Sequence, residues 1–145
     1  MDDWVRKIRK VLDCVLPGGM PQASPGNVPE GARAERLAEA HLTHHGAKIL
    51  ARNARCKGGE IDLIALHEGC VLFVEVRLRK RDDFGGAAAS ITAAKQRRII
   101  LTAQHWLQSS GQAFCCHPCR FDAMVLNALD GRVEWLKSAF EAGKS

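Results

Sequence analysis

The chain has 145 residues, a net charge of +5 at pH 7 and 46% hydrophobic residues, which is typical of one soluble globular domain. The positive charge favours an anionic partner, such as nucleic acid, acidic lipid or an acidic protein. No apolar run approaches the length of a membrane span, and the acidic start Met1-Asp2-Asp3 is unlike a signal peptide. We therefore expect a cytoplasmic protein with no membrane partner, in which the six cysteines are reduced.

Residues 1–30 are expected to lie outside the compact domain. The stretch from Trp4 to Leu16 has apolar residues at helical spacing and a basic opposite side, which indicates a short amphipathic helix. Such a helix can contact a membrane, nucleic acid or another protein, or pack on its own domain, and the pattern leaves these alternatives open. Residues 17–31 contain four of the five prolines, a composition typical of a linker. The domain is predicted to cover residues 31–145.

The first element of that domain is a helix predicted at residues 33–45, which is rich in Ala, Leu and Glu and is followed by Gly46 at its end. A first strand is predicted at residues 48–55. Histidines late in a helix suit the negative end of its dipole. We therefore assign no metal to the three that lie there: His41, His44 and His45.

A β-hairpin is predicted next. Two runs rich in β-forming residues, 59–67 and 70–77, are separated by the turn residues Glu68-Gly69. With those two residues as the loop, the ladder places Asp62 directly opposite Glu75. The two strands therefore bring two acidic side chains together.

Side chains alternate along a strand, so Asp62 and Glu75 share a face with Glu60 and Arg77. Opposed Cβ atoms lie roughly 4.5–5.5 Å apart, where two carboxylates repel unless a proton, a cation or water intervenes. A hard divalent cation suits such a pair, because Mg²⁺ usually takes one or two carboxylates with water and phosphate oxygens. The alternative is a solvated strand end, at which Glu60 and Arg77 form an ordinary ion pair. The opposite face is predicted to be apolar: Ile61, Leu63, Ala65, Leu72, Val74 and Val76.

The rest of the domain adds a loop at residues 80–86, a helix at residues 90–108, and strands at residues 120–128 and 132–136. The helix between the third and fourth strands predicts a crossover connection. We therefore expect the α/β class, with a mixed central sheet flanked by helices. The run Arg79-Lys80-Arg81 makes the start of the loop basic.

The segment Cys115-Cys116-His117-Pro118-Cys119 contains a Cys-x-x-Cys pattern. A structural zinc site normally needs a second such pair, well separated in sequence. Cys56 and Cys70 stand alone, so we expect a loop with reduced thiols rather than a metal site.

Some residues form a pattern that extends over residues 31–140: Gly31 to Glu35, Arg52-Asn53, Gly59 to Ile64, Phe73 to Arg79, Lys95 and Arg120 to Asp122. This pattern resembles the YraN-type family of small bacterial proteins. That family belongs to the restriction-endonuclease-like, PD-(D/E)xK superfamily and is similar to archaeal Holliday junction resolvases. The resemblance implies a core of helix, three-strand meander, helix and further strands, which agrees with the order predicted from the residues.

The resemblance also implies a metal-dependent nuclease site. Asp62 and Glu75 match the two metal-binding acids of the superfamily, and Glu35 is similar to an additional acid from the first helix. The backbone carbonyl of Val76 would complete the protein ligands for Mg²⁺ or Mn²⁺. The alternative for Glu35 is an ordinary surface charge on a helix.

Arg77 stands where the family motif has Lys. Arg stays charged and cannot act as a general base, although it can stabilise negative charge on a phosphate. Lys95, in the following helix, could supply the missing lysine from another element. Contacts with the nucleic-acid backbone are expected from four basic residues: Arg52, Arg55, Arg79 and Lys80.

The sequence therefore predicts a metal-dependent endonuclease that hydrolyses phosphodiester bonds in DNA. Branched DNA as the substrate, and a homodimer as the assembly, follow from the similarity to resolvases alone. The alternative is a catalytically impaired domain on a nuclease fold, marked by Arg77, that binds nucleic acid or another protein.

Overall fold

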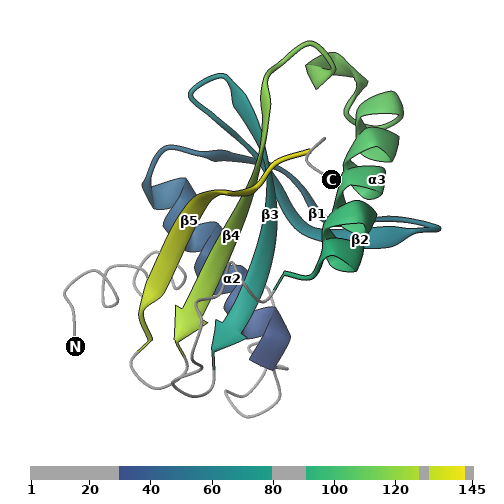
Figure 1. Ribbon diagram of the computed structural model, residues 1–145. Helices are drawn as coiled ribbons and strands as arrows, with labels where there is room; N and C mark the ends of the chain where they lie inside the picture. Colours follow the sequence, from purple (N-terminus) through teal and green to yellow (C-terminus); the bar gives the residue numbers. More distant parts are fainter. Residues whose placement is uncertain (1–29, 80–90, 128–130, 143–145) are drawn as a thin grey trace, which may run out of the picture.

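The computed structural model describes residues 30–79, 91–127 and 131–142, in which five strands form one sheet between two α-helices (Figure 1). The elements in chain order are α2 (Glu30–His44), β1 (Lys48–Cys56), β2 (Gly59–His67), β3 (Cys70–Arg79), α3 (Ala93–Gln108), the short 3-10 helix η2 (Gln112–Phe114), β4 (Cys119–Asn127) and β5 (Val133–Phe140). This confirms the predicted α/β class and the predicted order of elements. The amphipathic segment expected before residue 30 and the loop predicted at residues 80–86 lie outside the described residues.

The sheet is mixed, as predicted. Its strand order is β1-β2-β3-β4-β5. The first three strands form an antiparallel meander, β3 and β4 pair in parallel, and β4 and β5 are antiparallel. Because parallel neighbours cannot be joined by a tight turn, the chain crosses between β3 and β4 by way of α3.

The hairpin of β2 and β3 has the predicted register from His67–Cys70 to Leu63–Val74. Its two turn residues, Glu68 and Gly69, have φ values of 50° and 78°, as the common two-residue hairpin turn requires. The recorded ladder ends at Leu63–Val74, one pair before the two acids. There the carboxylate of Asp62 accepts the backbone N–H of Val76.

The predicted alternation is wrong at Ile61. This side chain packs with Ile64 on the α3 side of the sheet and not with Leu63. The physical reason is that the regular β2–β3 ladder stops at Leu63, so strict alternation of side chains no longer holds beyond it.

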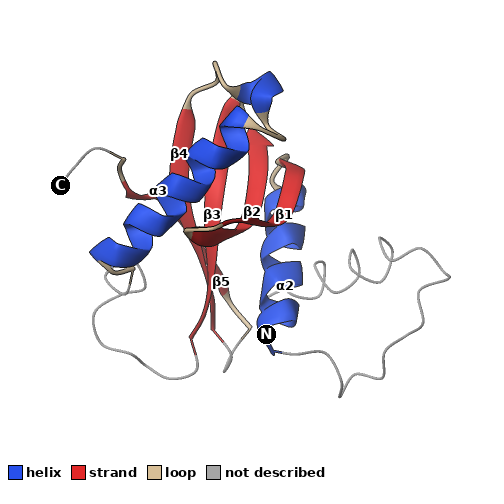
Figure 2. Ribbon diagram, turned by 90° about the vertical axis from the view of Figure 1, so that its right-hand side faces the viewer, coloured by secondary structure: helices blue, strands red, loops and turns tan. Residues whose placement is uncertain are grey.

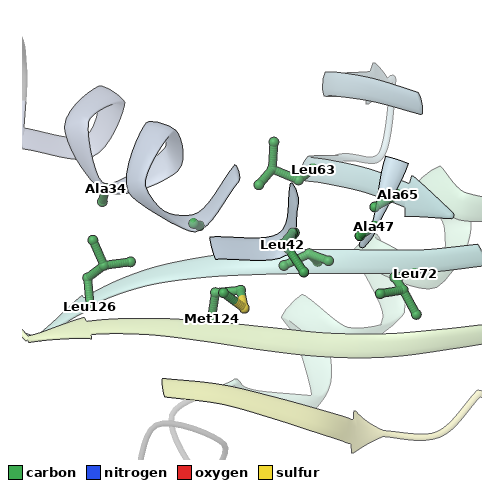
Figure 3. Packing of buried hydrophobic residues seen from close by; sticks show 10 residues of the cluster. Ala34, Leu42, Ala47, Leu63, Ala65, Leu72, Met124 and Leu126 are labelled. Atoms are coloured by element: carbon green, nitrogen blue, oxygen red, sulfur yellow. The ribbon is translucent and has the colours of Figure 1, made fainter. Parts of the chain in front are cut away.

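Each face of the sheet has its own hydrophobic core, because the two helices lie on opposite sides (Figure 2). On one side, small residues of α2 let that helix approach β2, β3 and β4, and Ala34 and Leu42 face Met124 and Leu126 (Figure 3). On the other side, α3 buries Ile99 and Trp106 against the strands. No helix in the described ranges has the length and apolar character needed to cross a membrane.

Candidate functional site

Two acidic side chains meet where the β2–β3 ladder ends. Glu75 is only 5% exposed, and Asp62 is half-buried, with its Oδ2 atom 2.8 Å from the backbone nitrogen of Val76. Burial, together with the negative charge of Glu75, raises the pKa of Asp62 from its ordinary value of 3.8 to about 7, while the hydrogen bond from Val76 acts in the opposite direction. The site therefore holds one negative charge more readily than two.

Lys95 reaches this acid pair from α3. Its Nζ atom lies 2.5 Å from Oε1 of Glu75, and Nη1 of Arg77 lies 3.9 Å from the same oxygen. The backbone of Lys95 is fixed by the helix N-cap, because the hydroxyl of Thr92 accepts its N–H at 3.1 Å. Of the two cations predicted at the site, Lys95 makes the closer contact with Glu75.

Glu35, on α2, is not among the cavity-lining residues, and it acts on the acid pair through its charge. Burial raises the pKa of Glu35, and the nearby charges of Glu60 and Glu75 raise it further, whereas a hydrogen bond with Asn53 lowers it. Asn53 has a φ of 50°, a left-handed conformation that Asn tolerates better than most residues. No role was predicted for Asn53 from the sequence, although it is part of the Arg52-Asn53 pair in the family pattern.

A cavity of about 510 Å³ opens over the acids, between the β1–β2 hairpin and α3. Its lining is mostly polar: Arg55, Cys56, Gly59, Glu60, Asp62, Glu75, Lys95, Arg98 and Ile99. Three basic and three acidic side chains thus line one opening. A volume of this size is within the usual range for ligand sites.

The donor set fits a hard divalent cation. Asp62 and Glu75 offer carboxylate oxygens, and their mutual repulsion would be relieved by a positive ion between them. Within the described ranges, no three His, Cys, Asp or Glu side chains are grouped so that they could hold an ion together. The ligands that the protein would give to the cation are therefore the carboxylates of Asp62 and Glu75 and, as predicted, the Val76 carbonyl. Glu35 would contribute mainly its negative charge.

The predicted backbone-binding residues fall in different places. Arg55 lines the cavity and forms an ion pair with Glu60 at 3.5 Å. The ion pair of Glu60 with Arg77, considered as the alternative for this end of the hairpin, is not the one that the structure shows for Glu60, whose partner is Arg55 on β1. Arg52 binds both carboxylate oxygens of Glu39 and is not among the cavity-lining residues.

The remaining two backbone-binding predictions concern the end of β3. Arg79 is half-buried there, and Lys80 lies outside the described residues. Arg98 was missed by the sequence analysis as a candidate, although it lies three residues after Lys95. The signal that could have found it is this spacing, which places both side chains on one helix face.

The Arg120-Phe121-Asp122 part of the family pattern has a structural role. Asp122 is fully buried, and its carboxylate accepts four hydrogen bonds, from Nε and Nη2 of Arg120 at 2.8 and 2.9 Å, from Nε1 of Trp135 at 2.8 Å and from the backbone of Ser138 at 3.0 Å. Ser138 has a φ of 54°. The β4–β5 register shifts between Phe121 and Ala123, so the network holds β5 across an irregularity in the sheet.

The cysteine-rich segment leads into β4, at the end of the sheet where β3 begins. Cys115, Cys116 and Cys119 are exposed and carry free thiols. In the part of the chain that the structure describes, they are not grouped with other ligands to hold a metal ion.

Comparison with known proteins places this site within a shared sequence pattern. A family model described as "Uncharacterised protein family UPF0102" matches residues 34–126, which include every residue that lines the cavity. The UPF0102 protein of Methylobacillus flagellatus is 50% identical over 113 residues, which cover 77% of this chain and 96% of the relative. Those of Saccharophagus degradans and Pseudomonas fluorescens are 49% and 44% identical, and the matches cover 76% and 77% of this chain and 91% and 93% of the relatives.

Proposed function

The chain belongs to the UPF0102 family, which is the YraN-type family that its motifs resemble. From the geometry of the acid pair, we propose that this protein is a divalent-cation-dependent nuclease that hydrolyses phosphodiester bonds in DNA. The observation that carries this proposal is the contact of Lys95 with Glu75 at 2.5 Å, beside an Asp62 whose pKa is raised to about 7. Two acids in one polar cavity can hold a divalent cation, and a lysine beside them can stabilise negative charge on a phosphate, which together suit metal-assisted hydrolysis of a phosphodiester.

Each residue has a stated part in the reaction. Asp62, Glu75 and the carbonyl of Val76 would hold Mg²⁺ or Mn²⁺, and Glu35 would strengthen the negative field that attracts the ion. When bound, the cation supplies positive charge beside the phosphate and a more acidic water. Lys95 takes the position of the lysine that Arg77 replaces, from a different element of the fold.

The chemistry consumes one water per bond cut. The water oxygen forms a bond to phosphorus, the bond from phosphorus to one sugar oxygen breaks, and solvent completes the proton balance. Negative charge builds on the phosphate oxygens during this step, and the ammonium of Lys95 and the guanidinium of Arg77 stabilise it. Both groups lie within 3.9 Å of Glu75 and so belong to the same small volume.

The experiment uses the purified full chain with labelled four-way junction DNA and with linear duplex DNA of the same sequence. Each DNA is incubated with Mg²⁺, with Mn²⁺ or with EDTA. We expect cutting that needs the cation and that is abolished in Asp62→Ala. Faster cutting of the four-way junction would identify branched DNA as the substrate.

Two other results would overturn the nuclease proposal. Tight binding without cutting, in the wild type and in Arg77→Lys, would identify a binding protein on a nuclease fold. If the protein shows no binding and no cutting of any DNA, both the nuclease and the DNA-binding version are excluded. Calorimetric titration with Mn²⁺ adds an independent readout, because Asp62→Ala should lose the binding that the wild type has.

A further inference from the structure

We propose that Arg98 is a phosphate-binding residue of this site, and that it binds the backbone phosphate next to the one at the acid pair. The inference rests on the proposed function, since it names a further contact with the same substrate. Its first support is position: Arg98 lines the cavity that also contains Asp62, Glu75 and Lys95.

The helix places Arg98 and Lys95 on one face. Residues three apart on an α-helix are neighbours, and their Cα atoms are separated by about 4.5 Å along the axis. A single DNA strand carries one phosphate per about 3.4 Å of helix axis. Lys95 and Arg98 therefore present two long cationic side chains to the same opening, which is what contact with more than one phosphate of a strand needs. Arg97, which directly precedes Arg98 in the sequence, is not among the cavity-lining residues.

The second support is the number of ion pairs that the basic side chains of the cavity already make. Three cationic side chains line the cavity, and two of them are engaged: Arg55 with Glu60 at 3.5 Å, and Lys95 with Glu75 at 2.5 Å. For the Arg98 guanidinium, the structure records no ion pair with a described residue. An exposed guanidinium on a rigid helix is well suited to phosphate, because its planar N–H groups can form two parallel hydrogen bonds.

The third support is the close contact that fixes Arg98 over the hairpin. A Cβ atom added at Gly59 would lie 2.9 Å from the backbone oxygen of Arg98 and 3.0 Å from its Cβ. The same backbone oxygen accepts the hydroxyl of Thr102 at 2.8 Å. Gly59 is therefore a positioning residue, because only a residue without a side chain lets α3 approach the strand that leads to Asp62.

The test compares Arg98→Ala with Arg97→Ala, which removes the same charge from the same helix and from a side chain that is also exposed. Binding of fluorescein-labelled duplex and four-way junction DNA is measured by fluorescence anisotropy at several salt concentrations, without divalent cation. We expect Arg98→Ala to reduce the slope of log affinity against log salt by about 1. At ~0.1 M salt its affinity should fall about tenfold more than that of Arg97→Ala.

A third variant, Arg98→Lys, keeps the charge and should recover part of the affinity but not all of it, since it lacks the paired hydrogen bonds. Equal losses in Arg98→Ala and Arg97→Ala, in a protein whose wild type cuts DNA, would overturn the role of Arg98 and leave the nuclease proposal intact. A wild type that neither binds nor cuts DNA would overturn both proposals.

Discussion

The raised pKa of Asp62 predicts that replacing this residue by Asn stabilises the metal-free protein at neutral pH. Asn keeps an oxygen that can accept the Val76 N–H, but it removes the charge that burial and Glu75 disfavour. A pKa of about 7 in the folded protein, against an ordinary 3.8, corresponds to at most about 4 kcal/mol. Because Asp62 and Glu75 share this repulsion and the site can relax, we expect a gain of about 2 kcal/mol at pH 8.

The direction of the pH dependence follows from proton binding. Between pH 4 and 7 the folded protein keeps a proton on Asp62 that the unfolded chain has lost. The free energy of unfolding therefore falls as pH rises through this range. The destabilisation by the charged Asp62 carboxylate is fully present above pH 7. The advantage of Asp62→Asn over the wild type should shrink by more than half between pH 8 and pH 5.

The assay is urea unfolding in EDTA, followed by tryptophan fluorescence at pH 8 and pH 5 and analysed by linear extrapolation. Glu60→Gln is the matched control, because this acid lines the same cavity but its side chain is 42% exposed and paired with Arg55. The control should change stability by less than about 0.5 kcal/mol. An Asp62→Asn variant that is no more stable than the wild type at pH 8, or whose gain is the same at pH 5, would refute the reasoning.

Three further predictions concern the surroundings of the acid pair. Gly59→Ala should destabilise the protein by about 1–3 kcal/mol in urea unfolding, because the new Cβ meets the backbone of Arg98. In the control Gly58→Ala the new Cβ meets the end of the flexible Leu101 side chain, so the cost should be less than half as large. Equal costs would contradict this prediction. Asp122→Ala should cost about 3 kcal/mol or more in the same assay, since it leaves a half-buried guanidinium and an indole N–H without their acceptor. A near-neutral result would show that the network is dispensable. In the DNA cleavage assay, Lys95→Met should slow cutting by about 100-fold and Arg77→Met by less than about tenfold. The reason is that Lys95 makes the closer contact with Glu75. The reverse order would show that Arg77 is the main cation that stabilises charge on the phosphate.

The sequence by itself determined the hairpin and its register. The turn Glu68-Gly69 needs positive φ at both positions, and the structure has it there. Because a strand has a period of two residues, that turn length decided the pairing as far as Leu63–Val74, one pair before the two acids. The class and the order of elements followed in the same way, since periodicity and turn residues are local properties.

Only the tertiary structure decided that Lys95 and Arg98 line one cavity with the two acids, and that Asp122 accepts four hydrogen bonds in the interior. Lys95 and Arg98 reach the cavity because α3 packs across the hairpin at Gly59, a contact between elements that no local pattern encodes. The burial of Asp122 is of the same kind. Packing energy depends on which surfaces meet, and that is fixed only when the whole chain has folded.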